Sequence, residues 1–128
     1  MTDSLYKEII LDHYRNPRNF GHLVGLTHFA ALHNPFCGDR IRIDIKREGE
    51  HIADINFSGN GCALSMASAS LLTEQVKGKP ASVVGELTQD TLLALLGIEV
   101  GAVRLKCVML PLEVLKKVGG FEANKLSS

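Results

Sequence analysis

The stretch RIRIDIKREGEHIADINFS, residues 40–58, decides the fold of this 128-residue chain. Isoleucine alternates with polar residues over 40–47, and a second run over 52–58 follows the turn Glu48-Gly49-Glu50. This alternation predicts two β-strands, each with one buried face. Because the connection is short, the strands should be antiparallel and keep one face in water. The expected buried residues are Ile41, Ile43, Ile45, Ile55 and Phe57, with Arg40, Arg42, Asp44 and Lys46 on the opposite face.

The flanking sequence adds a strand and several helices. Weak alternation over 26–33 predicts a third strand. Helical spacing predicts a helix that starts after Asp3 or Ser4 and ends before Asn16-Pro17, then helices over 62–76, 81–87, 89–96 and 103–118. Pro111 cannot donate to the carbonyl of Cys107, so we expect a kink or break in the last helix. The predicted fold is α+β, a three-stranded antiparallel sheet with helices packed mainly on one face.

Length and composition indicate a single domain, residues 1–128, with a loose tail from about residue 119. Hydrophobic residues make up 45% of the chain, which excludes a disordered protein. Lys+Arg and Asp+Glu number 14 each, so the basic excess of a nucleic-acid-binding protein is missing. The sequence has neither a long hydrophobic run nor a signal peptide, so we expect no membrane span and a cytoplasmic location.

The three cysteines are the residues best suited to chemistry. Their odd number argues against a secreted disulfide framework, and cytosolic thiols stay reduced. Cys37 lies in the predicted loop between the first two strands, Cys62 at the start of a helix, and Cys107 shortly before Pro111. Positions at the junctions of predicted elements favour metal binding or thiol chemistry.

The neighbours of the cysteines support this interpretation. A helix N-terminus favours an anionic Cys62. Asp39 follows Cys37 across a glycine, so both side chains can turn toward one point. Three thiolates and one carboxylate would suit Zn²⁺ or iron, and the carboxylate suggests a site that opens. The basic residues expected to favour the thiolate of the third cysteine are Arg104 and Lys106.

Plainer explanations exist for each feature. Free cysteines often pack as small hydrophobic residues, and the spacing here matches no common zinc motif. The run Gly59-Asn60-Gly61 could instead hold an anion at a helix N-terminus. Among the five histidines, only His33 lies near the Cys37 loop.

The cysteine segments resemble the IscU/NifU N-terminal family of iron–sulfur cluster assembly proteins. The resemblance extends over roughly residues 5–118. Its motifs are Asn16-Pro17-Arg18-Asn19, Asn34-Pro35-Phe36-Cys37-Gly38-Asp39, Gly59-Asn60-Gly61-Cys62-Ala63, the Ser/Ala-rich run 65–70, and Lys106-Cys107.

The resemblance implies the same α+β fold and a cytosolic protein that accepts sulfur from a cysteine desulfurase and serves recipient apo-proteins. Such a protein is a scaffold or sulfur acceptor more than a conventional enzyme. It would bind zinc, iron or a transient [2Fe–2S] cluster. The ligands carried over by the resemblance are Cys37, Asp39, Cys62 and Cys107.

Two departures from the scaffold branch matter. Lys106 stands where scaffolds have a histidine, and residues 100–104 replace the Leu-Pro-Pro-Val-Lys segment that an Hsp70-type chaperone binds, which argues against that partner. Lys106 and Arg104 resemble the zinc-binding SufU branch instead. The segment between the second and third cysteines, however, is short like a scaffold's.

Several roles therefore stay open. The chain could hold a cluster, or pass on sulfur in the SufU manner without holding one. Cys37, on a loop beside glycine, is the first candidate for the persulfide acceptor, and Cys107 the second. A structural zinc module and a thiol-dependent hydrolase are the alternatives from other classes. The hydrolase needs a base, and no histidine neighbours a cysteine in sequence.

Overall fold

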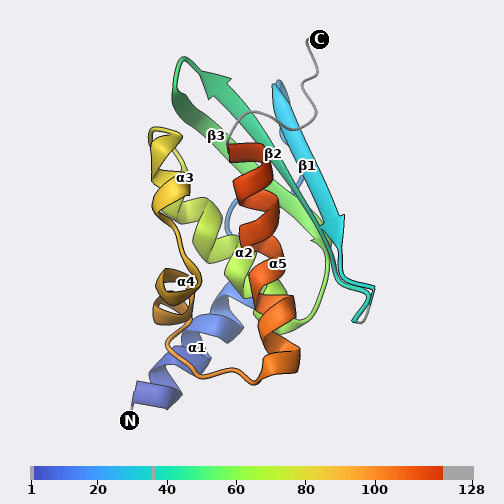
Figure 1. The fold of residues 1–128 in the computed structure, drawn as a ribbon, viewed down its shortest axis with the longest axis vertical. Helices are drawn as coiled ribbons and strands as arrows, with labels where there is room; N and C mark the ends of the chain where they lie inside the picture. The colour runs from blue at the N-terminus through green and yellow to red at the C-terminus, as the bar shows by residue number, and fades with distance from the viewer. Residues whose placement is uncertain (1, 36, 120–128) are drawn as a thin grey trace.

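The computed structural model describes residues 2–35 and 37–119 of the chain. Helices cover one face of a three-stranded sheet, with α2 and α5 lying directly against the strands (Figure 1). The predicted α+β fold is therefore confirmed. The elements in chain order are α1 (Thr2–Arg15), β1 (His28–His33), β2 (Arg40–Glu48), β3 (His51–Asn60), α2 (Ala63–Val76), α3 (Ser82–Glu86), α4 (Gln89–Leu96) and α5 (Ala102–Gly119).

The sheet has the order β1-β2-β3, with both pairs antiparallel. All five residues predicted for its buried face are at most 1% exposed. Ile52 is also fully buried, although it lies out of step with Ile55. A register shift explains this, because Lys46 pairs with Asp54 while Arg47 pairs with Ile52, which leaves one extra residue in β3.

The outer face of the sheet was predicted to lie in water, and for Asp44 that prediction is wrong. That carboxylate is only 1% exposed. It accepts hydrogen bonds from Arg42 Nε at 2.7 Å and from the backbone N–H of Leu23 at 3.2 Å. The segment between α1 and β1 thus covers this part of the outer face, and alternation within the strand could not reveal that cover.

Helix α5 runs unbroken from Ala102 to Gly119 with Pro111 inside it, so the predicted break is wrong. One lost hydrogen bond and a steric clash cost about 3 kcal/mol. Each buried leucine contributes about 1.5–3 kcal/mol, and leucines on both sides of the proline are buried. Packing against the sheet and α2 therefore maintains the helix.

Helix α1 begins at Thr2, earlier than predicted, and packs on α2. The ends of α4 agree with local sequence signals. Thr88 caps α4 by accepting a hydrogen bond from the backbone N–H of Thr91, and Gly97 ends that helix in a left-handed conformation. None of the described helices is long and hydrophobic enough to cross a membrane. The predicted loose tail lies outside the described residues.

Candidate metal centre

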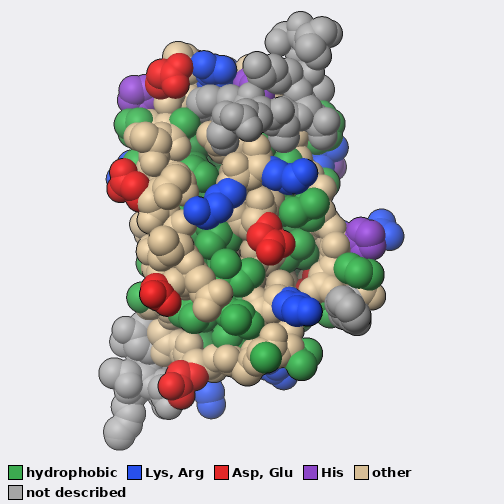
Figure 2. Space-filling model, viewed as in Figure 1, with side chains coloured by type: hydrophobic (Ala, Val, Ile, Leu, Met, Phe, Trp, Pro, Cys, Tyr) green, Lys and Arg blue, Asp and Glu red, His purple; other side chains and the backbone are tan. Residues whose placement is uncertain are grey.

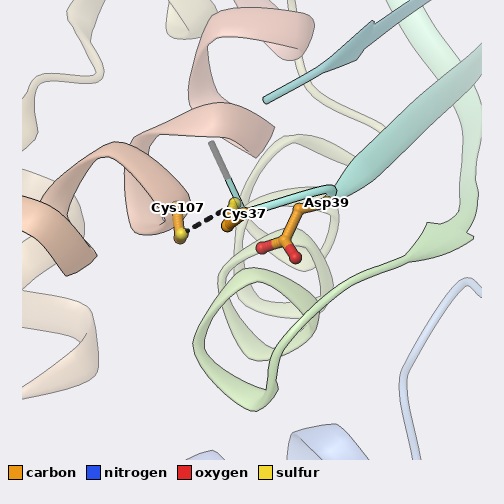
Figure 3. Close-up of side chains that lie close together, drawn as sticks. All are labelled: Cys37, Asp39 and Cys107. Carbon is orange, nitrogen blue, oxygen red and sulfur yellow. Dashed lines mark hydrogen bonds between the residues drawn. The ribbon is translucent and has the colours of Figure 1, made fainter. Parts of the chain in front are cut away.

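Three of the predicted site residues converge at one end of the sheet. One ligand atom from each of Cys37, Asp39 and Cys107 lies within 4.8 Å of the others. Figure 3 shows these side chains pointing toward one another, Cys37 and Asp39 from the segment between β1 and β2 and Cys107 from α5. The fold thus brings together residues 70 positions apart in the sequence.

The loop between β1 and β2 is closed by its own backbone. The N–H of Asn34 donates to the carbonyl of Asp39 at 2.8 Å, and the N–H of Gly38 donates back to the carbonyl of Asn34 at 2.7 Å. Gly38 has a φ of 77°, which a side chain would disfavour. This closure leaves Cys37 exposed and turns Asp39 inward, where it is 5% exposed.

Asp39 is held at the N-terminal end of α2. Burial is the largest influence on its carboxyl group and would raise the pKa. Hydrogen bonds from the Ser65 hydroxyl, the Cys62 backbone and the thiols of Cys37 and Cys62 outweigh burial, so the pKa of Asp39 is lowered. The Ser65 Oγ lies 2.6 Å from Asp39 Oδ2. The site therefore contains a fixed, ionised carboxylate.

Cys107 lies in the second turn of α5, so the prediction that it occupies a junction between elements is wrong. It is 7% exposed, and its thiol donates to Cys37 Sγ at 3.0 Å (Figure 3). Burial, followed by the contact with Cys37, raises the pKa of Cys107 to about 12. Arg104 and Lys106 are exposed, and burial is the largest influence on the Cys107 thiol, so the expectation that they favour its thiolate stays a prediction.

Cys62 stands beside the three convergent residues but outside their set. It is the N-cap residue of α2, as predicted, and its side chain is exposed. Its sulfur lies 3.8 Å from the Ser65 hydroxyl, which in turn contacts Asp39. Cys62 thus contacts the Asp39 carboxylate directly and also through the Ser65 hydroxyl.

The donor atoms fit a zinc or iron ion. Zn²⁺ binds thiolate and carboxylate ligands in a tetrahedron with Zn–S distances of about 2.3 Å, which separates two sulfurs by about 3.8 Å. The sulfurs of Cys37 and Cys107 are 3.0 Å apart, so they would need to separate by about 0.8 Å. The side chain of Cys37 is exposed, so a rotation about its Cα–Cβ bond can separate the two sulfurs without a shift of the core.

A cavity of about 300 Å³ opens beside the two sulfurs. It is lined by Asn34, Cys37, Ala102, Val103, Lys106 and Cys107. Lys106 places a cation at this cavity, while Arg104 does not line it. On the helical face, charged side chains of both signs are interspersed with hydrophobic ones (Figure 2). The cavity gives a reactant access to the cysteine sulfurs.

Ser65 also belongs to the site, although it was not among the predicted site residues. It is the third residue of α2, fully buried, and contacts both Asp39 and the backbone of Cys107. The local signals were its place three residues after Cys62 and at the start of the Ser/Ala-rich run 65–70. His33 is exposed and lines a separate cavity. No histidine among the described residues joins the convergent ligand atoms.

The sequence is also similar to that of known proteins. The profile of the family described as NifU-like N terminal domain matches residues 5–125. The zinc-dependent sulfurtransferase SufU of Bacillus subtilis is 48% identical over 77 residues, which are 60% of this chain and 52% of that protein. The iron–sulfur cluster assembly scaffold protein IscU 1 of Archaeoglobus fulgidus is 37% identical over 93 residues, which are 73% of this chain and 61% of that protein.

The matched segments thus span between half and two thirds of the length of these two relatives. A solved structure, the N-terminal part of a nitrogen-fixing NifU-like protein from Brucella abortus, superposes with a TM-score of 0.72 at 19% identity. The superposition covers 88% of this chain and 90% of that one. It shows that the two chains share a fold.

Proposed function

The chain belongs to the family of NifU-like N-terminal domains, and from that premise we propose that it accepts sulfur from a cysteine desulfurase during iron–sulfur cluster assembly. The observation that carries the proposal is the convergence of an exposed thiol, a buried thiol and a buried carboxylate at one cavity. We treat residues 1–128 as one domain with this role.

Cys37 is the proposed persulfide acceptor. Its thiolate would attack the outer sulfur of the desulfurase persulfide, and the desulfurase cysteine would leave as a thiolate. One S–S bond forms and one breaks, so the step needs no oxidant or reductant. Exposure favours Cys37 over Cys107, whose thiol is buried and has a raised pKa. Cys62 is also exposed and is the structural competitor.

The proposed metal ligands are Cys37, Asp39, Cys62 and Cys107, with zinc or iron as the ion. A bound ion would hold its cysteine ligands as thiolates. Asp39 is already ionised, and Ser65 fixes one of its oxygens. Lys106, at the cavity, would attract an incoming anionic persulfide.

A transient [2Fe–2S] cluster is the proposed cargo, to be passed to apo-proteins. Similarity to IscU 1 supports a scaffold role, while similarity to SufU supports a zinc-dependent sulfur shuttle. We favour sulfur acceptance as the role common to both. The replacement of the Leu-Pro-Pro-Val-Lys segment by residues 100–104 still argues against an Hsp70-type chaperone as a partner, and the cytoplasmic location stays a prediction.

A persulfide assay tests the proposal directly. Purified chain is incubated with a cysteine desulfurase from the same organism and L-cysteine, and persulfides are mapped by mass spectrometry. We expect one added sulfur on Cys37. If the chain gains no sulfur while retaining its zinc through the assay, the purely structural zinc module is favoured instead.

A further inference from the structure

Pro111 leaves one acceptor in α5 without its usual partner. In a helix, the carbonyl of Cys107 would accept from the N–H of residue 111, but proline has none. The Ser65 hydroxyl instead lies 2.8 Å from this carbonyl oxygen. A proline in α5 thus makes the backbone of a proposed ligand residue available to a side chain of α2.

The same hydroxyl also contacts the proposed carboxylate ligand. Ser65 Oγ lies 2.6 Å from Asp39 Oδ2, and the side chain is fully buried. A hydroxyl has a single proton, so the two oxygens share or compete for it. A carboxylate that gives charge to a metal is a weaker acceptor, which leaves more of the proton to the Cys107 carbonyl.

We propose that Ser65 is a positioning residue that, through the carbonyl exposed by Pro111, sets the relative placement of Asp39 and Cys107 and thereby the retention of metal. The proposal rests on the metal site proposed above. Hydrogen-bonding partners of metal ligands typically change metal affinity by about 10–100-fold when removed.

The chain supplies a matched control in Ser68. It lies on the same helix and is equally buried, but its Oγ has no hydrogen-bond partner among the described residues. Ser65→Ala and Ser68→Ala therefore remove the same atom from equally buried positions. Only the first removes contacts to Asp39 and Cys107.

The test measures zinc affinity by chelator competition and the absorption spectrum of the cobalt(II)-loaded chain. Thermal unfolding of the chelator-treated chain measures the stability of the fold without any contribution from bound metal. We expect Ser65→Ala to weaken zinc binding by about 10–100-fold and to change the cobalt spectrum, with Ser68→Ala close to the parent. Equal zinc affinities and equal cobalt spectra for the two variants would overturn the inference.

Pro111→Ala tests the coupling. The alanine N–H can satisfy the Cys107 carbonyl, so Ser65→Ala should weaken zinc binding less in the Pro111→Ala background than in the parent. If Ser65→Ala alone does not fold, the double variant keeps the carbonyl satisfied and isolates the Asp39 contact. Equal weakening of zinc binding by Ser65→Ala in both backgrounds would overturn the role of the Cys107 carbonyl. Where only the double variant folds, zinc binding as tight as in Pro111→Ala would overturn the role of the Asp39 contact.

Two further outcomes distinguish a failure of the proposed metal site from a failure of the positioning role of Ser65. A parent chain that binds neither zinc nor cobalt overturns the proposed metal site and this inference with it. A parent chain that binds both, with Ser65→Ala losing thermal stability but no zinc affinity, overturns the inference alone. Sulfur acceptance by Cys37 is measured separately and does not enter this comparison.

Discussion

The sulfur atoms of Cys37 and Cys107 lie 3.0 Å apart, one at the protein surface and the other beneath it. The exposed sulfur belongs to a loop and the buried one to a helix in the core. This difference in access gives the two thiols different chemistry, because a thiol must be reachable and deprotonated to react.

Replacement of Cys37 by serine should abolish sulfur acceptance, since serine offers no nucleophilic sulfur at the cavity. Persulfide mapping by mass spectrometry after incubation with a desulfurase checks this. Cys62→Ser is the matched control, because it removes another exposed thiol. Normal loading of Cys37→Ser, with loading lost in Cys62→Ser, would transfer the acceptor role to Cys62.

Thiol alkylation of the chelator-treated chain should modify Cys37 and Cys62 before Cys107. Cys107 is 7% exposed, and its raised pKa of about 12 leaves little thiolate at neutral pH. Its alkylation rate should rise with pH throughout the range in which the chain stays folded. Peptide mapping after timed treatment with iodoacetamide measures the order, and simultaneous modification of the three thiols would contradict it.

Asp39→Ala should speed the release of zinc by about tenfold or more, because an ionised carboxylate beside two thiols is lost. Release is followed with a chromogenic chelator. Asp90→Ala removes an exposed carboxylate from α4 and serves as the control. Unchanged metal content and release rate in Asp39→Ala would end the ligand assignment.

His13 should make the fold less stable in mild acid. Burial, reinforced by Arg18, lowers the pKa of His13 below the ordinary 6.5, against opposing effects of Glu74 and Asp12. The unfolded chain therefore takes up the proton first. The contribution of His13 to stability is complete above about pH 6.5 and is lost as the pH falls below it.

His13 is buried against α2, where its Nδ1 lies 2.7 Å from Ser70 Oγ. The same hydroxyl accepts a hydrogen bond from the backbone N–H of Arg18 at 2.9 Å. Melting temperatures between pH 7 and pH 5 should fall less steeply in His13→Gln than in the parent. His51→Gln, at an exposed position, should retain the parent slope, and identical slopes in all three chains would refute the assignment.

Gly59→Ala should destabilise the end of the sheet next to the site. Gly59 has a φ of 138°, and an added Cβ would lie 2.1 Å from the Arg40 carbonyl oxygen. Strain and steric conflict together should reduce the free energy of unfolding by about 3 kcal/mol or more. Gly85→Ala, in α3 with open space around it, should be neutral or stabilising by up to about 1 kcal/mol. Urea denaturation compares the two.

Local patterns predicted most of the secondary structure. Alternating isoleucines located β2 and its buried face, and Thr88 with Gly97 bounded α4. These signals depend on residues within a few positions of each other, where propensity and periodicity act directly. The cysteines and Asp39 were picked out by their residue types and by the family resemblance.

Tertiary structure decided the features that local patterns could not. The sequence by itself determined which faces were hydrophobic, because side-chain direction follows the repeat of each element. Only packing buried Asp44, kept α5 continuous through Pro111, and brought Cys107 to Cys37. Burial energy from distant segments outweighs a local proline penalty, and that balance exists only once the helices lie on the sheet.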